Sequence, residues 1–522
     1  IRKFSKEIEP TNLLAIKNEL QRKQLLEKHN TYTYFSGLLA RDCYKAEIEA
    51  VVRSNQLSGF QLLGLQDYPG QNTATIGMLD SHWEEKGFCT PEDFCEFNQG
   101  LIPMVELSKR IFGNKELMDY HIGIRNSTGC DILPEDVTKI TVTLGDQLLE
   151  LFSLDTVVKS GEYQIIKKGS FELGRLACEY GRQFELQITV QKEGRRFQNH
   201  WPIWVFATEN LTSDEIIQDS WISPKIINGL QTGQTCVVSL SPSKHAGVSP
   251  GNYFPVFWSP VFFESTDACG MMVNKEHSLF RYFPTENYLT LQWKRLVENS
   301  VCFPAHTSRA ITELIPNFFV NEQRTNIEEF QVGSGKLLIH GFDLERISEP
   351  EEIAFRNALI RYVQSSDFKP NDSVDIETIQ HYFPVNVDEE TERKDLAYRC
   401  RAWADNEKSQ KMSAVKANDG NPFTFWTTAA QTDSHWWCID LGCVQTLSEL
   451  VIEVLNYEVV DFTILSSLDG QEWTSVRDVT SKQDVYNLTE KIQARMLKLM
   501  FRHPLNVAPG IRKFQAFTSE GE

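Results

Sequence analysis

The chain has 522 residues, enough for several domains of ordinary size, and its hydrophobic fraction of 41% is ordinary for globular proteins. The formal net charge of −19 leaves no surplus of lysine and arginine to neutralise phosphates, which argues against nucleic acid or an anionic membrane as a partner. No run approaches the ~18 apolar residues of a membrane-spanning helix.

The 11 cysteines form no metal-binding array. The closest pairs, Cys89 with Cys95 and Cys438 with Cys443, are not CxxC pairs, and no zinc-spaced histidines accompany them. We expect most of the cysteines to be buried thiols. The sequence has neither a starting methionine nor a signal peptide. We therefore expect Ile1 to be a cut end, and the chain to be the C-terminal part of a larger protein.

Two amphipathic helices are predicted, at residues 12–29 and 38–53. An apolar run follows at Phe60–Leu65 and breaks abruptly into polar residues that begin with Gln66 and Asp67. A short apolar run of this kind predicts a buried strand followed by a loop. In α/β barrels, polar side chains just past the C-terminal end of a buried strand form the active site. An ordinary turn after a buried strand is the alternative.

A helix start is predicted at Thr90, which is a suitable N-cap and is followed by Pro91 and two acidic residues. We expect this helix to run toward Phe112. Helix, strand, loop and helix together are typical of the closing unit of a β/α (TIM) barrel, which we assign to residues 1–112. A single barrel strand does not fold by itself, so the other strands are expected upstream of Ile1 or in another chain.

The rest of the chain divides into four further segments. Residues 113–207 carry short stretches rich in β-branched and aromatic residues, which predict an immunoglobulin-like β-sandwich. Residues 208–368 alternate helical and strand patterns, which favours an open α/β domain. The Gly333–Lys336 stretch lacks the GxxxxGK[ST] spacing of a phosphate loop, so we expect no nucleotide site there. An acidic linker with one short helix is predicted at 369–395, and a second β-sandwich at 396–522.

The stretch LLGLQDYPGQNTATIGMLDSHWEEKG resembles the last barrel strand of glycoside hydrolase family 2 enzymes, the β-galactosidase/β-glucuronidase group, with Gly77 and Lys86 at corresponding spacing. Together with Ser36–Arg53, it is still more similar to the large multi-domain enzymes of this kind from polysaccharide-degrading gut bacteria. The stretches HWPIWVF and GSGKLLIHGFDL are similar to their sandwich and to their flavodoxin- or amidotransferase-like accessory domain, which is structural in that setting.

The resemblance implies a retaining glycosidase, in which two carboxylates about 5 Å apart act as acid/base and nucleophile. It places both carboxylates upstream of Ile1, so no catalytic residue is expected in this chain. It also implies that Gln66, Asp67 and Gln71 lie at the rim of the sugar site and bond to hydroxyl groups. The alternative is that Asp67 only ties down its own turn. Leu63 stands where the β-glucuronidase pattern has a tryptophan, so the identity of the sugar does not carry over.

The stretches ANDGNPFTFWTT, HWWCIDLG and SSLDGQEW resemble a discoidin-type (coagulation factor C-domain-like) module. In glycosidases such modules often bind sugars, and they often hold a calcium ion through carboxylate and carbonyl oxygens. Carried over to this sequence, the calcium ligands are Asp419, Asn421 and Thr424. Lys513 departs from the family pattern, because the final strand usually supplies a glutamate at about that position, and a lysine there opposes a cation.

The sequence therefore predicts a multidomain α/β plus all-β protein, the C-terminal portion of a periplasmic or secreted retaining exo-β-glycosidase. The enzyme is expected to be β-galactosidase-like and to act on a plant- or host-derived polysaccharide or oligosaccharide. Its expected partners are the carbohydrate and the upstream part of the same polypeptide. Catalysis needs no cofactor, and the discoidin-type module is a candidate for a structural calcium ion.

Two other functions stay open from the sequence. The first is a non-catalytic carbohydrate-binding or scaffold protein, in which the barrel remnant supports the discoidin-type module. The second, less favoured, is an amidotransferase or nucleotide enzyme seated in residues 208–368. The oligomeric state is left open.

Overall fold

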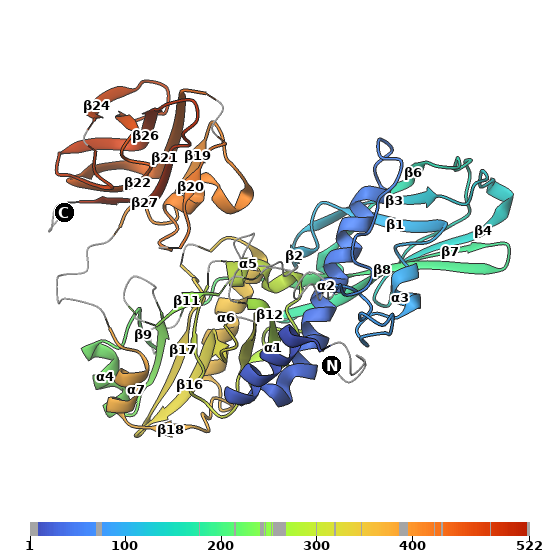
Figure 1. Cartoon of the computed structure of the whole chain (residues 1–522), viewed down its shortest axis with the longest axis horizontal. Coiled ribbons are helices and arrows are strands. Elements are labelled where there is room, and N and C mark those ends of the chain that lie inside the picture. Colours follow the sequence, from blue (N-terminus) through green and yellow to red (C-terminus); the bar gives the residue numbers. More distant parts are fainter. Residues whose placement is uncertain are drawn as a thin grey trace. The chain divides into compact units, whose positions relative to one another are not determined.

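The computed structural model divides into two compact units (Figure 1). Unit 1 comprises Ile1–Leu240 and Gly247–Tyr382, and unit 2 comprises Ser241–Ala246 and Phe383–Glu522. Most of the regular structure is β-sheet. The described residues are 9–68, 76–176, 178–212, 216–240, 245, 247–251, 253, 268–298, 300–317, 320–345, 347–385, 395–421, 423–429, 432–480 and 482–518.

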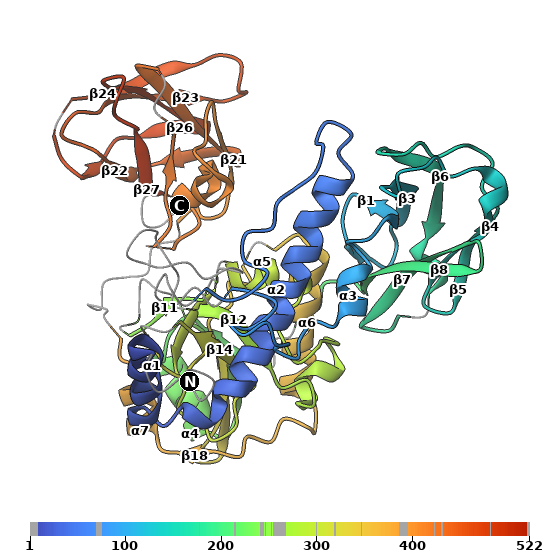
Figure 2. The ribbon, with the colours of Figure 1, turned by 45° about the vertical axis from the view of Figure 1, so that its right-hand side comes forward.

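The N-terminal segment forms two helices, as predicted, but with different bounds: α1 spans Thr11–Arg22 and α2 spans His29–Val52, so the first helix ends earlier and the second begins earlier than the sequence indicated. With 24 residues, α2 is roughly 36 Å long. Figures 1 and 2 both show α2 extending from the α/β part of unit 1 to the β-sandwich of unit 1. Its length allows one helix to contact both parts.

Hydrogen bonds fix α2 to both parts of unit 1. In the α/β part, the Tyr288 hydroxyl donates to Asp42 Oδ2 at 2.7 Å. At the sandwich, the buried Glu49 accepts from Trp201 Nε1 at 2.9 Å and from Asn199 Nδ2 at 3.1 Å. A buried carboxylate is stable in the fold only when it is paired in this way.

The prediction of a buried strand at Phe60–Leu65 is wrong. These residues form no strand, and the Leu63 side chain is 80% exposed. A strand needs a neighbour for its backbone hydrogen bonds. In the described part of the chain no strand pairs with this run, and an isolated bridge joins Gln66 to Leu79 just after it. The assignment of residues 1–112 to the end of a β/α barrel stays a prediction.

The predicted helix start at Thr90 is confirmed, but the predicted length of the helix is wrong. Thr90 caps α3 (Pro91–Cys95) through reciprocal hydrogen bonds with Asp93. The helix then ends, because Leu101–Leu107 forms strand β1 and pairs along its whole length with β3 (Leu117–Asn126). The long-range ladder overrides the local helical pattern. Strand pairing therefore begins before residue 113.

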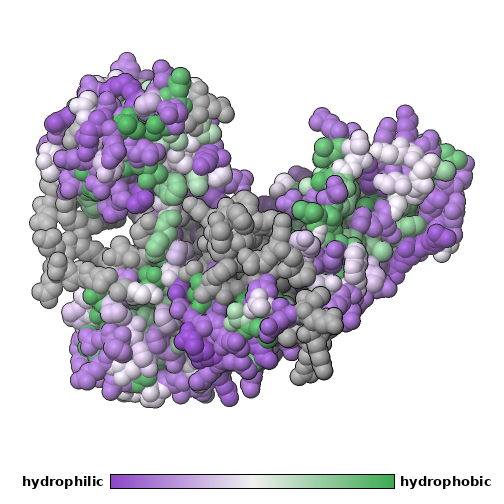
Figure 3. Space-filling view, in the orientation of Figure 1, coloured by the Kyte–Doolittle hydropathy of each residue, from purple (hydrophilic) through white to green (hydrophobic). Residues whose placement is uncertain are grey.

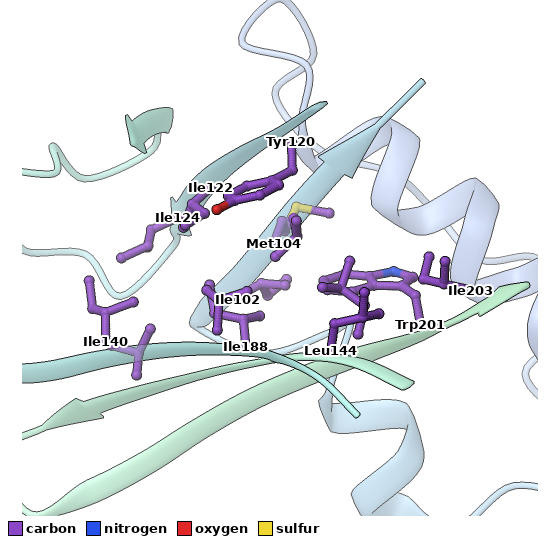
Figure 4. Packing of buried hydrophobic residues seen from close by; sticks show 14 of the residues in the cluster. Ile102, Met104, Tyr120, Ile122, Ile124, Ile140, Leu144, Ile188, Trp201 and Ile203 are labelled. Carbon is purple, nitrogen blue, oxygen red and sulfur yellow. The ribbon is translucent and has the colours of Figure 1, made fainter. Parts of the chain in front are cut away.

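Two sheets pack face to face in the sandwich that follows α3. One has the order β1-β3-β6, where β6 spans Tyr163–Glu172. The other has the order β2-β8-β7-β4-β5, and these strands are Ile111–Gly113, Arg195–Phe206, Gly181–Lys192, Val137–Leu144 and Gln147–Phe152. Side chains from both sheets, including Ile122 and Ile188, meet in the core (Figure 4). The immunoglobulin-like type of this sandwich stays a prediction.

The α/β part of unit 1 contains two sheets, and the first is a mixed sheet with helices. Its order is β18-β16-β17-β10-β9, and these strands are Ser373–Val374, Ile327–Val332, Gly335–His340, Thr235–Ser239 and Ile217–Asp219. Strand β10 is parallel to β9 and β17, whereas β16 is antiparallel to β17. The helices are α4 (Pro224–Gln231), α5 (Lys294–Glu298), α6 (Pro350–Gln364) and α7 (Ile376–Tyr382). Helix α7 is the short helix predicted within the linker.

A second, antiparallel sheet in this part was not predicted. Its order is β11-β13-β15-β14-β12, and these strands are Ser249–Pro250, Val301–Pro304, Arg324–Thr325, Thr312–Pro316 and Ala268–Val273. The Gly333–Lys336 stretch joins β16 to β17, and Lys336 Nζ donates to the Phe368 carbonyl at 2.6 Å. Lys336 thus forms a contact within the fold, and the expectation that this stretch holds no nucleotide stays a prediction.

Unit 2 is a second β-sandwich, as predicted. One sheet has the order β19-β21-β26-β23-β24, with strands Arg401–Ala404, Ser434–Leu447, Ile492–Arg502, Asp461–Ser467 and Thr474–Val479. The other has the order β20-β27-β22-β25, with strands Trp426–Thr427, Gly510–Phe517, Glu449–Leu455 and Val485–Leu488. Trp426 and Trp437 are fully buried in the core of this unit.

The prediction that most cysteines are buried is wrong. All 11 are free thiols, and three of them are buried, whereas Cys95, Cys130 and Cys443 are exposed. A small, weakly polar thiol is tolerated at half-buried positions as well as in the core. None of the helices in the described part of the chain combines the length and the apolar content that a membrane span requires.

Candidate functional site

Asp67 connects the start of the segment that follows the apolar run to the later residues Gly77, Leu79 and Lys86. Its Oδ1 accepts a hydrogen bond from the Gly77 backbone N–H at 3.0 Å and lies 2.6 Å from Lys86 Nζ. The Asp67 N–H donates to the Leu79 carbonyl at 3.0 Å. Gly77 permits this approach, because a Cβ there would lie 2.3 Å from the carbonyl carbon of Gln66. Gly77 and Lys86 thus both serve to hold Asp67.

The Asp67–Lys86 ion pair is largely buried, since the two side chains are 13% and 12% exposed. Burial raises the pKa of Asp67, and the Lys86 ammonium counteracts part of this rise. Tyr44 of α2 donates to the Ile76 carbonyl at 3.2 Å, and the pKa of Tyr44 is raised by burial and by the charge of Asp67. Helix α2 therefore supports the loop that carries the pair.

The predicted sugar-site residues have different surroundings. The contacts of Asp67 Oδ1 favour the turn-tying alternative for that oxygen. Asp67 Oδ2 accepts no hydrogen bond within the described part of the chain. Gln66 is its neighbour and lies half-buried in the bridge to Leu79. Gln71 lies outside the described residues.

Two exposed aromatic residues lie close to this pair in the sequence, and the sequence analysis missed both. Tyr68 is 55% exposed, and Trp83 is 62% exposed with a φ of +64°, which is rare for a bulky residue. Asp80 stabilises the turn, because its Oδ1 accepts from the backbone N–H groups of His82 at 2.8 Å and Glu84 at 3.0 Å. A tryptophan within a run of polar residues was the available signal, since such rings usually lie in cores.

The residues predicted to bind calcium come together in unit 2. Thr424 Oγ1 lies 2.8 and 2.9 Å from the two carboxylate oxygens of Asp419, 3.1 Å from the Asn421 carbonyl and 3.4 Å from the Lys416 carbonyl. One hydroxyl carries one proton, so it cannot satisfy four acceptors. Oxygens gathered in this way fit a hard cation such as calcium. Asn421 would contribute its carbonyl, because its Oδ1 already accepts from the Phe423 N–H at 3.0 Å.

A lysine does lie beside this cluster, but it is not the one indicated by the sequence. Lys416 Nζ is 3.6 Å from Asp419 Oδ2, whereas the Lys513 side chain is exposed on β27. Burial raises the pKa of Asp419, and the charges of Lys416 and Arg399 counteract the rise. Among the described residues, no three His, Cys, Asp or Glu side chains gather as metal ligands. An ion here would therefore depend on carbonyl and hydroxyl oxygens as well as on Asp419.

The sequence of residues 401–510 matches the model of the F5/8 type C domain. These residues form an F5/8 type C domain. The α/β part of unit 1 matches a second model at residues 217–384, described as a domain of unknown function (DUF8487). No curated protein matches the chain.

Several solved structures are similar to part of the chain. Chitosan-binding module 1 of a chitosanase/glucanase from Paenibacillus sp. IK-5 is 21% identical over 24% of this chain and 98% of that one, with a TM-score of 0.22. The family 32 carbohydrate-binding module of Clostridium perfringens NanJ, in complex with galactose, is 19% identical over 23% and 93%, with a TM-score of 0.21. A family 29 fucosidase from Ruminococcus gnavus is 16% identical over 24% and 27%, with a TM-score of 0.23.

Proposed function

We propose that this chain is the C-terminal portion of a β-galactosidase-like retaining exo-β-glycosidase whose catalytic carboxylates lie upstream in the same polypeptide. The observation that carries the proposal is the apolar run Phe60–Leu65, whose Phe60 and Leu63 are exposed and which ends just before the largely buried Asp67–Lys86 pair. An exposed apolar stretch without a strand partner is a surface for another part of the protein. An upstream barrel strand paired with it would put Asp67 at the end of a buried strand, where barrel sites lie.

The side chains around Asp67 have the chemistry of a sugar site. The Oδ2 atom of Asp67 can accept a hydrogen bond from a sugar hydroxyl, and the Gln66 amide can donate or accept one. The rings of Tyr68 and Trp83 offer flat apolar surfaces to the C–H faces of a pyranose. The proposed substrates are β-galactoside-like units of a plant- or host-derived polysaccharide or oligosaccharide.

The F5/8 type C domain has a separate role in this proposal. It binds glycan and keeps the enzyme at its polysaccharide, in the periplasm or outside the cell. Domains of this type are typical of extracellular proteins. Calcium would be held by Asp419, by Thr424 Oγ1 and by the carbonyl oxygens of Lys416 and Asn421, and it would neutralise charge that the domain otherwise buries. Catalysis itself uses no cofactor.

A complementation experiment tests the enzyme. The 522-residue chain alone should not hydrolyse a nitrophenyl β-galactoside, and co-expression with the upstream part of its gene product should restore turnover. Leu63→Asp should prevent the two parts from associating, because it places a charge in the proposed interface. Leu505→Asp is the matched control, since Leu505 is an exposed leucine of unit 2. Turnover by the chain alone would contradict the upstream location of the carboxylates.

The role of Asp67 is tested in the intact polypeptide. Asp67→Ala should lower kcat/KM by a larger factor than its small effect on Tm explains. Equal losses of activity and stability would leave Asp67 with the turn-tying role alone. The non-catalytic alternative is decided by the upstream sequence: one strand should end in an Asn-Glu pair and a later strand in a glutamate. If both are absent, the chain is a carbohydrate-binding or scaffold protein.

A further inference from the structure

A group of tryptophans and cations lies on the outer face of one sheet of unit 2. Side chains alternate along a strand, and Trp437 and Ile439 of β21 point into the core, so Trp436 faces outward. In the strand register, Trp403 of β19 lies opposite Cys438 of β21, which lies opposite Lys498 of β26. The surface of unit 2 that is visible in Figure 3 is mainly hydrophilic, with hydrophobic side chains scattered among the others.

Two cations on this face lie over indole rings. Lys498 Nζ is 4.3 Å from the ring centroid of Trp436 and 5.5 Å from that of Trp473. The guanidinium carbon of Arg401 is 5.5 Å from the ring centroid of Trp403. All three tryptophans are partly exposed. Cation–π contacts hold the charges at the rings but supply no anionic acceptor for their N–H groups.

Within the described residues, neither Lys498 nor Arg401 has a carboxylate oxygen within ion-pair distance. Arg401 lies opposite Asp440 in the strand register, and, beside the hydrogen bonds from Arg495, its charge contributes to the lowered pKa of Asp440. Asp440, which also lies on this face, is held by Arg495 through Nε at 3.0 Å and Nη2 at 2.8 Å. This face therefore has the charge to attract an anion.

We propose that the face formed by Trp403, Trp436, Trp473, Lys498 and Arg401 binds an acidic polysaccharide made of uronic-acid units. A uronate unit has both features that the face can recognise. Its carboxylate accepts charge-assisted hydrogen bonds from Lys498 and Arg401, and its pyranose ring stacks on the indoles. An acidic peptide would use the cations but has no ring of this shape, and a neutral glycan would leave the cations unpaired. The inference rests on the proposed glycan-binding role of the domain.

Calorimetry with the 522-residue chain tests this inference. An oligogalacturonate should bind in the presence of EDTA, and a neutral galacto-oligosaccharide of the same length should not bind to this face. Raising NaCl from about 50 to about 300 mM should weaken binding of the acidic ligand, because screening acts on the exposed charges. Lys498→Met should weaken it about tenfold or more, since it removes a charge-assisted hydrogen bond.

Two variants control for folding and for non-specific attraction. Lys498→Arg keeps the cation and should retain binding. Arg512→Gln removes an exposed cation from the other sheet, where Arg512 pairs with Glu453 at 3.2 Å, and should leave binding unchanged. If Lys498→Met lowers Tm so far that the domain unfolds, Arg401→Gln is measured in its place, with the same expected loss.

Each contrary outcome has a defined meaning. If both oligosaccharides bind equally and Lys498→Met has no effect, the domain binds glycan through another surface, and the proposed function stands while this inference falls. If neither oligosaccharide binds, this inference and the glycan-binding role proposed for the domain are both overturned, whereas the proposed glycosidase activity is decided separately by the complementation experiment. If polyglutamate competes as well as oligogalacturonate, the face binds acidic peptide, and the assignment to a uronate glycan is overturned.

Discussion

Replacing Asp67 by alanine should open the loop between Leu65 and Lys86 without unfolding unit 1. The substitution removes the acceptor of the Gly77 N–H and leaves the largely buried Lys86 ammonium without its carboxylate. A hydrogen bond to a charged group contributes about 1.5–3 kcal/mol. Lys86 can move toward water once the loop opens, so the full cost of an unpaired buried charge does not apply. We expect a local loss of about 2–3 kcal/mol, which corresponds to a factor of about 30–150 in the opening equilibrium.

Native-state hydrogen exchange measures this opening directly. The Gly77 amide should exchange about 30–150 times faster in Asp67→Ala, while amides of the paired strands β7 and β8 keep their protection. Asp131→Ala is the matched control, because it removes a comparable bond to the Ser160 N–H at 2.8 Å in the sandwich and should not affect Gly77. Unchanged exchange at Gly77 in Asp67→Ala would refute the tying role of this carboxylate.

Three further predictions concern buried and paired carboxylates. Glu49→Leu should lower the free energy of unfolding of unit 1 by about 2–4 kcal/mol in urea, because the Trp201 indole N–H loses its acceptor in the core; a smaller loss would mean that water replaces the carboxylate. Calcium should raise the Tm of unit 2 relative to EDTA, more at pH 8 than at pH 5, because burial raises the pKa of Asp419 and protons compete with the ion; Asp419→Ala should abolish the rise. The hydrogen bonds from Arg495 lower the pKa of Asp440 in the folded state. The Asp440–Arg495 pair therefore stabilises unit 2 fully at pH values above the unfolded-state pKa of Asp440, and this stabilisation is lost as the pH falls through the folded-state pKa. Arg495→Gln should flatten the acid side of the plot of Tm against pH for unit 2, and an unchanged plot would count against the pair.

Local chemistry was predictable where a few adjacent residues determine the structure. Thr90, Pro91 and Asp93 specify a helix start by themselves, and the structure has that cap. The end of the same helix was not predictable from its neighbours, because Leu101–Leu107 is apolar enough for a helix or a strand. Its partner strand lies further along the chain, so the pairing becomes visible only in the fold.

The candidate sites likewise depend on contacts that the sequence does not reveal. The sequence identified Asp419, Asn421 and Thr424 as neighbours, but the position of Lys416 beside Asp419 depends on how the chain turns between them. The apolar run at Phe60–Leu65 has the composition of a buried strand, yet composition cannot supply the neighbouring strand that burial requires. The exposure of a large side chain such as Trp83 depends on which residues pack around it in the fold, so the sequence does not determine it directly.

Helix α2 has a mechanical consequence for the Asp67 loop. It is anchored to the α/β part through Asp42 and to the sandwich through Glu49, and between these points Tyr44 bonds to the loop at Ile76. Because α2 is hydrogen-bonded to both parts of unit 1, the position of the loop depends on both parts. A substitution that removes one of these attachments, such as Glu49→Leu, should therefore shift the loop, although Glu49 contacts none of the loop residues that the structure describes.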